Sequence, residues 1–73
     1  MANETEKLIK IGKKISYYRN LKNLSQNQLA EKLNISREHL AKLETAKRRI
    51  SLKLLFKLVD ILEIKEIDIF NFD

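Results

Sequence analysis

The chain contains no proline, and its only glycine is Gly12. Tight turns between β-strands depend on glycine, often in Asn-Gly or Asp-Gly pairs, so this sequence lacks the residues that hairpins require. Helices joined by short polar turns are therefore the expected architecture. No linker, low-complexity tract or internal repeat interrupts the sequence, and we expect a single domain over residues 1–73.

The length and composition of the chain limit what it can contain. With 73 residues it buries too little surface for a large core of its own, so a partner that covers apolar surface is expected. It has no cysteine and a single histidine, His39. Because a zinc site needs several Cys or His ligands, no metal or cofactor is expected. The longest apolar run covers only residues 54–56, and residues 1–6 do not resemble a signal peptide. These features indicate a cytoplasmic protein that does not enter a membrane.

Five segments are expected to form helices, from their apolar spacing and their capping residues. The first covers residues 5–21, whose apolar stripe is Leu8, Ile11, Ile15 and Tyr18. The others cover residues 26–33, 37–44, 52–62 and a short segment that begins near Glu66. Three of them directly follow a serine that can cap the helix, namely Ser25, Ser36 and Ser51.

Charge is distributed unevenly along the chain. Residues 1–50 contain 12 Lys or Arg against 5 Asp or Glu, a net charge of +7. Residues 51–73 contain 3 against 5, a net charge of −2. The basic part is expected to contact a polyanion, and the alternative is a surface that only keeps the protein soluble. The C-terminal segment is expected to have a different task.

The two short helices at residues 26–33 and 37–44 are joined by only Asn34, Ile35 and Ser36. This spacing is typical of a helix-turn-helix, in which the first helix lies against the DNA backbone and the second enters the major groove. Asn34 tolerates the left-handed conformation that ends the first helix, and Ile35 is expected to be buried. Alone, the pattern is weak evidence, because any helical bundle contains short turns.

A longer set of residues is similar to one known family. It covers residues 11–70 and consists of Ile11, Gly12, Ile15, Tyr18, Arg19, Leu24, Ser25, Gln26, Leu29, Ala30, Ile35, Ser36, Leu40, Leu43, Glu44, Lys47, Ser51, Leu55, Leu58 and Leu62. In these residues the chain resembles the phage repressor and Cro type of helix-turn-helix protein, the XRE family. The resemblance implies a compact, all-α, five-helix bundle of the lambda repressor-like kind. It also implies binding to double-stranded DNA, usually as a symmetric dimer on a palindromic operator.

The resemblance implies that the helix at residues 37–44 reads base edges. Arg37 can pair with guanine O6 and N7, and Glu38 can accept from cytosine N4, so a G·C or C·G step in each half-site is expected. Lys42 lies one turn further on the same face, and His39 is expected to contact a base or a phosphate. For Glu38 the alternative is an ion pair with Lys42, which stabilises a helix by only ~0.2–0.5 kcal/mol.

Other residues are expected to contact DNA phosphates. The resemblance assigns this role to Gln26, and Ser25 and Ser36 stand at helix N-termini, where unpaired N–H groups and the helix dipole attract anions. The alternative for Ser25 is a capping role alone. The loop after the recognition helix adds a basic cluster of Lys47, Arg48 and Arg49. Weaker candidates on the first helix are Lys10, Lys13 and Lys14.

Residues 51–73 are too apolar for the surface of a monomer. In the helix at residues 52–62 the only polar side chains are Lys53, Lys57 and Asp60. A domain of this size lacks the interior to bury all the others, so this segment is expected to contribute a dimer interface. The residues expected there are Phe56, Val59, Ile64, Ile67, Phe70 and Phe72.

The resemblance also implies a buried structural ion pair between Arg19 and Glu44. Removing one partner would leave a buried charge unpaired. The sequence departs from the family at Asn34, Ala46 and Glu63, where glycine is usual, and at Ile50, where proline is common. If position 46 has a positive φ, alanine is strained there by ~1 kcal/mol.

Two functions are compatible with these features. The first is a sequence-specific transcriptional regulator, a repressor in the main interpretation, that acts as a homodimer by occupying its operator and thereby excludes or contacts RNA polymerase. The controller proteins of restriction-modification systems are one compatible group within the family. The second is an antitoxin-like module whose apolar segment, residues 64–72, masks another protein and which binds DNA secondarily.

An enzyme is not expected, and no catalytic residue is assigned. Ser36 and His39 are three residues apart, but no carboxylate that would orient the histidine and no oxyanion donor is apparent. Binding of single-stranded nucleic acid is also disfavoured. Tyr17 and Tyr18 are adjacent, and Tyr18 is expected to face the core rather than to form a stacking platform.

Overall fold

The structure, a computed structural model, describes residues 3–72, so the expected domain over residues 1–73 extends beyond the described range by three terminal residues. The described residues form no strand and contain the helices α1 (Glu4–Leu21), α2 (Gln26–Leu33), α3 (Arg37–Glu44), α4 (Leu52–Leu62) and α5 (Glu66–Phe70). The all-α, five-helix fold expected from the sequence is confirmed. The Cα radius of gyration of 11.3 Å matches the about 11 Å expected for a compact chain of this length.

Short side chains at the helix starts explain why the helices begin where they do. Ser25, Ser36 and Ser51 each accept a hydrogen bond from the backbone N–H three residues further on, at 3.0, 2.9 and 3.1 Å. At Ser25 the bond is reciprocal, because its own N–H donates to Gln28 Oε1 at 2.8 Å. Such capping bonds satisfy donors that have no partner within the helix. The starts of α2, α3 and α4 are therefore set by local sequence.

Two of the helices end at a residue in the left-handed backbone conformation. Asn34, which follows α2, has φ of 57°, and Glu63, which follows α4, has φ of 56°. Ala46, in the loop after α3, has φ of 62°, so the positive φ considered for this position is confirmed. Lys57 also stabilises the end of α2, because its Nζ donates to the carbonyl of Leu33 at 3.2 Å.

The core lies where all five helices meet, and each helix contributes to it. Its fully buried side chains are Ile15, Leu29, Ala30, Leu33, Leu40, Leu43, Leu55, Leu58, Val59, Leu62 and Ile69. Tyr18 and Ile35 pack against this cluster while half-buried. Val59 corrects an expectation: it was expected in a dimer interface, but its side chain is only 2% exposed in the monomer. A side chain enclosed in this way offers no surface to a second copy.

Gly12 allows α1 and α3 to approach closely. A Cβ at this position would stand 2.8 Å from the Leu43 carbonyl oxygen and still closer to that of Glu44, which is well inside van der Waals contact. The C-terminal end of α3 therefore rests directly against the backbone of α1.

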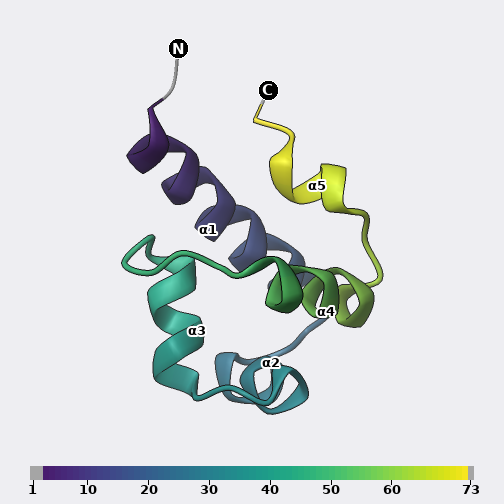
Figure 1. The fold of residues 1–73 in the computed structure, drawn as a ribbon. Helices are drawn as coiled ribbons and strands as arrows, with labels where there is room; N and C mark the ends of the chain where they lie inside the picture. Colours follow the sequence, from purple (N-terminus) through teal and green to yellow (C-terminus); the bar gives the residue numbers. More distant parts are fainter. Residues whose placement is uncertain (1–2, 73) are drawn as a thin grey trace.

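Figure 1 shows how this packing arranges the helices. α2 and α3 lie at one end of the molecule, and the N-terminal half of α1 and α5 lie at the other. The end that carries the helix-turn-helix is thus separate from the end that carries α5 and the start of α1. Over residues 3–72, no helix has the length and apolar character needed to cross a membrane.

Candidate nucleic-acid interface

The outer face of α3 carries the residues expected to read bases. Arg37 and Glu38 stand in its first turn and Lys42 follows one turn later, and all three side chains are exposed. Lys42 Nζ lies 3.4 Å from Glu38 Oε1, so the ion pair that was the alternative for Glu38 is present in the unbound protein. An exposed pair of this kind holds its partners weakly. Both side chains remain available to an approaching ligand.

Gln26 connects this face to the interior. Its side-chain Nε2 donates to Glu44 Oε1 at 3.0 Å, and its Oε1 accepts from an Nη1 proton of Arg37 at 3.3 Å. The orientation of the amide is determined, because a carboxylate only accepts and a guanidinium only donates. Gln26 was expected to contact a phosphate, and in the unbound protein both ends of its amide have protein partners.

Glu44 receives several donors at once. Arg19 donates to it from Nε at 2.8 Å and from Nη2 at 3.2 Å, and Gln26 supplies the third bond. The remaining Arg19 nitrogen, Nη1, donates to the Leu24 carbonyl at 2.8 Å. The ion pair that the resemblance implies is therefore present, with side chains that are only 12% and 5% exposed. It joins α1, the start of α2 and the end of α3.

His39 lies on a different side of α3 from Arg37. The two positions are separated by about 200° around the helix, and His39 lines a hollow of about 320 Å³ near the start of α4, together with Ser51, Lys53 and Lys57. Partial burial, then the charges of Arg48 and Lys42, lower the pKa of His39 below its usual value. This placement separates His39 from Arg37, whereas Lys42, three residues further along α3, lies on the same side as His39.

The hollow beside His39 contains basic residues that sequence reasoning did not assign. Lys53 and Lys57 were interpreted only as the polar stripe of their helix, yet both line this hollow next to the recognition helix. Their spacing of four residues places them on one face of α4. This four-residue spacing, directly after the basic loop, was the sequence feature from which both lysines could have been predicted to lie near the recognition helix.

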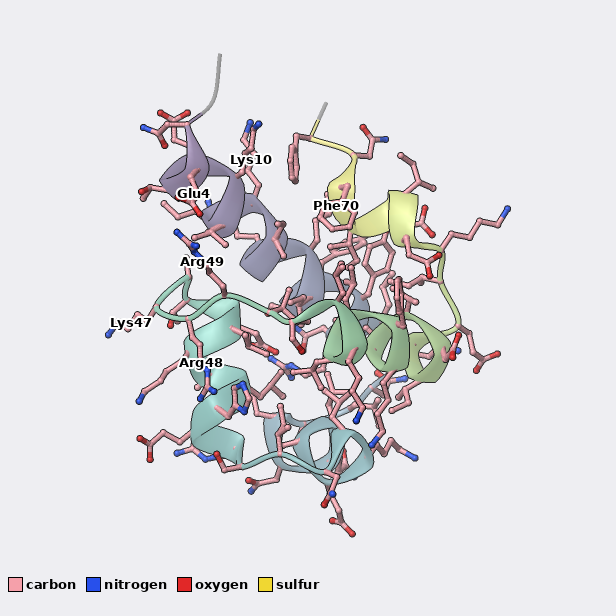
Figure 2. All side chains as sticks on the ribbon, in the orientation of Figure 1. Glu4, Lys10, Lys47, Arg48, Arg49 and Phe70 are labelled. Carbon is pink, nitrogen blue, oxygen red and sulfur yellow. The ribbon has the colours of Figure 1, made fainter. Side chains whose placement is uncertain are left out.

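The basic side chains of the loop between α3 and α4 do not all point the same way. Figure 2 shows Lys47 projecting into solvent and Arg48 directed along α3, whereas Arg49 turns toward the start of α1. Arg49 forms an ion pair there with Glu4. Lys47 and Arg48 therefore lie close to the recognition helix, and Arg49 already has a carboxylate partner.

Residues 15–70 match the model of a protein family described as Helix-turn-helix. The chain belongs to this helix-turn-helix family. It is 43% identical over 60 residues to a protein of Methanocaldococcus jannaschii named as an HTH-type transcriptional regulator, a match that covers 82% of this chain and 91% of that one. The XRE-type resemblance is confirmed. The family consists of DNA-binding regulators of transcription rather than of enzymes.

Solved structures show the same arrangement of helices. The restriction-modification controller protein C.AhdI from Aeromonas hydrophila superposes with a TM-score of 0.81 at 32% identity, covering 86% of this chain and 96% of that chain. The controller protein C.Esp1396I gives 0.80 at 28%, covering 93% and 88%. The clp gene regulator ClgR from Corynebacterium glutamicum gives 0.84 at 24%, covering 92% and 71%, which shows a shared fold.

This helix-turn-helix protein also exposes apolar side chains on α4 and α5. Of the residues expected in a dimer interface, Phe56, Ile67 and Phe70 are 52%, 64% and 41% exposed. Ile64 and Phe72 are half-buried, and Ile64 packs against the core. Leu52 at the start of α4 is 68% exposed and was not assigned to the interface. Because most other residues of α4 are apolar too, the sequence pattern did not distinguish an exposed Leu52 from the core residues.

Lys10, Lys13 and Lys14 were weaker candidates for DNA contacts, and they lie elsewhere. All three line a second hollow together with Phe72 near the C-terminal end of the chain. Figure 2 shows Lys10 beside this end and far from α3. Separation in a projection is a lower limit on separation in space, so Lys10 does not belong to the face that carries Arg37.

Proposed function

We propose that this helix-turn-helix protein is a sequence-specific regulator that binds double-stranded DNA as a symmetric homodimer on a palindromic operator and acts as a repressor. The observation that carries the proposal is the arrangement of Arg37. Its guanidinium is exposed at the N-terminus of α3 and is linked through Gln26 to the buried Arg19–Glu44 pair. A base-reading group that is positioned before binding loses less conformational freedom when the complex forms.

Arg37 would read a guanine in each half-site. Only one of its guanidinium nitrogens is engaged by Gln26, so two others stay available for the bidentate contact with guanine O6 and N7. Glu38 would accept from a cytosine N4 after leaving Lys42, and the exposure of that ion pair keeps the cost low. Lys42 would then contact DNA from the same face.

Phosphate contacts would surround this face on both sides. Ser25 and Gln26 stand at the start of α2, and Ser36 stands at the start of α3, where backbone N–H groups attract anions. Across the recognition helix, Lys47 and Arg48 would neutralise the other strand, together with His39, which lines the basic hollow. Arg49 would join them by exchanging Glu4 for a phosphate.

The dimer would form through α4 and α5. Phe56, Ile67 and Phe70 offer exposed apolar surface on these two helices, and burying such surface is favourable. A two-fold axis there would direct two copies of α3 to half-sites one helical turn apart. A regulator of this kind acts in the cytoplasm, where its DNA is, and represses by keeping RNA polymerase from the occupied site.

The antitoxin-like alternative is not favoured, because the relatives reported above are regulators of genes or of restriction-modification systems. In that alternative the apolar surface of α4 and α5 would cover another protein. Sedimentation of the purified chain separates the two: a homodimer uses this surface for itself, whereas a monomer leaves it for a different partner.

The direct test is selection from random duplex DNA with the purified protein at near-physiological salt, followed by sequencing of the retained molecules. We expect a palindrome with half-sites about one helical turn apart. Retention without any enriched sequence, lost steeply as salt rises, would leave only a basic surface and contradict the proposal. Transcription from a promoter that contains the selected site then shows whether occupancy represses.

A further inference from the structure

A second hollow lies at the end of the molecule away from α3. It has a volume of about 560 Å³ and lies between α1 and the residues that follow α5. We call it the α1–tail hollow. Its walls are three lysines of α1, three aromatic rings and Asn71. The volume falls within the range of about 300–1,000 Å³ that is usual for small-molecule sites.

The aromatic part of the hollow offers ring surface from two segments. Tyr17 and Tyr18 stand edge to face, with ring centroids 5.0 Å apart and an interplanar angle of 80°. Phe72 approaches from the other side, and Lys10 Nζ lies 5.8 Å from the centroid of its ring. Tyr18 packs against the core as expected, and because it is half-buried it also lines this hollow. Planar ligands stack on exposed rings of this kind.

Among the described residues that line the hollow, none is a carboxylate that could balance its lysines. Lys10, Lys13 and Lys14 recur at i, i+3 and i+4, so they share one face of α1. Within residues 3–72, the ion pairs of the protein join other residues, and none includes these three lysines. Three like charges next to each other repel, and a multivalent anion would relieve that repulsion.

We propose that the α1–tail hollow binds a nucleoside di- or triphosphate, with the phosphates at the three lysines and the base against the aromatic rings. The two halves of the hollow select this class together. A simple anion would leave the rings unused, and an uncharged aromatic compound would leave the lysines unpaired. A single carboxylate would balance only one of the three charges. The site is independent of operator binding, since Lys10 lies far from the face that carries Arg37 (Figure 2).

The test uses NMR of the full chain titrated with ATP. Tyr17 and Tyr18 are the only tyrosines, and both line the hollow, so tyrosine ring resonances report on this site alone. We expect them to shift together with those of Phe72, while the amides of α2 and α3 stay in place. No shift at the rings, or shifts centred on α3, would overturn the proposal.

Two ligand fragments test whether both halves are used. Inorganic tripolyphosphate carries the charges without the base, and adenosine carries the base without the charges. Each is expected to bind roughly tenfold or more weakly than ATP, because each lacks one set of contacts. Tripolyphosphate that binds as tightly as ATP would reduce the hollow to a basic surface and overturn the proposal.

Two pairs of matched variants locate the contacts. Tyr17→Ala is expected to weaken ATP binding roughly fivefold or more, whereas Tyr17→Phe keeps the ring and the affinity. Tyr17 is 57% exposed, so its removal leaves the core intact. The combined change of Lys10, Lys13 and Lys14 to Gln is expected to weaken ATP binding roughly tenfold or more. The same change at Lys32, Lys53 and Lys65 alters the net charge equally and should not, and an equal loss in this control would overturn the proposal.

Discussion

Arg19 reaches from α1 to the end of α3 and donates to both carboxylate oxygens of Glu44, from Nε to Oε2 at 2.8 Å and from Nη2 to Oε1 at 3.2 Å. The two side chains are 12% and 5% exposed, so the carboxylate depends on protein donors rather than on water. Because Gln26 shares the same carboxylate, the pair also determines how the start of α2 meets the end of α3. The ion pair therefore supports both the stability of the fold and the position of Arg37.

Replacing Arg19 by methionine should destabilise the protein by ~3–5 kcal/mol, because Glu44 would keep a buried charge with one weaker donor. Urea denaturation followed by circular dichroism measures the change. The control is Lys22→Met, which breaks the exposed Lys22–Glu63 pair and should change the stability far less, because water screens an exposed ion pair. Equal effects of the two variants would show that burial of the Arg19–Glu44 pair is unimportant.

Replacing Ala46 by glycine should stabilise the protein by ~1 kcal/mol. Ala46 has φ of 62°, where a Cβ is strained and glycine is not. The matched control is Ala41→Gly within α3, which should destabilise by about the same amount, because glycine is unfavourable in a helix. Thermal unfolding of both variants reads out the sign, and a loss of stability at position 46 would contradict the prediction.

The helices were predictable because their signals are local. A serine cap needs only the backbone N–H three residues later, and Ser25, Ser36 and Ser51 all cap the helices they precede. The left-handed turn at Asn34 is local in the same sense, because its side chain tolerates positive φ.

The misplaced residues depend instead on contacts between distant segments. The helix at residues 52–62 is apolar around most of its circumference, so periodicity could not tell which side faces the core, and Val59 was assigned outward. The link from Arg37 through Gln26 to Glu44 joins α3 to α2 and back, and the α1–tail hollow joins two ends of the chain. Neither has a signal in any short stretch of sequence.

The folding stability should depend on pH through His39. The pKa of His39 is lowered by partial burial and by the charges of Arg48 and Lys42, so the unfolded chain takes up this proton at a higher pH than the folded protein does. The free energy of unfolding should therefore fall as the pH drops from above the usual value of 6.5 through the lowered pKa.

The check is urea denaturation of wild type and His39→Gln across this pH range. The variant should lose the dependence on pH. Glu63 does not interfere, because the hydrogen bond and the charge of Lys22 lower its pKa from 4.5, and its contribution is lost only in more acidic solution. Parallel curves for the two proteins would contradict the role of His39.

Replacing Ile67 by lysine should convert the proposed homodimer into a monomer. Ile67 is 64% exposed, so the folded monomer tolerates the change, whereas a charge inside an apolar interface is costly. Leu21→Lys is the control, because Leu21 is 60% exposed but lies on α1, outside the proposed interface. Analytical ultracentrifugation distinguishes the two, and a dimer that survives Ile67→Lys would place the interface elsewhere.

Replacing Arg37 by alanine should weaken binding to the selected operator by ~1–3 kcal/mol and relax the preference for guanine at one position of each half-site. The fold should remain intact, since the Arg37 side chain is exposed and, within residues 3–72, donates a single hydrogen bond, to Gln26 at 3.3 Å. Lys47→Ala is the matched comparison, because loss of a phosphate contact weakens binding to all sequences alike and reduces its salt dependence. Titrations of operator and scrambled duplex with both variants give the comparison. Unchanged operator affinity for Arg37→Ala would remove Arg37 from base recognition.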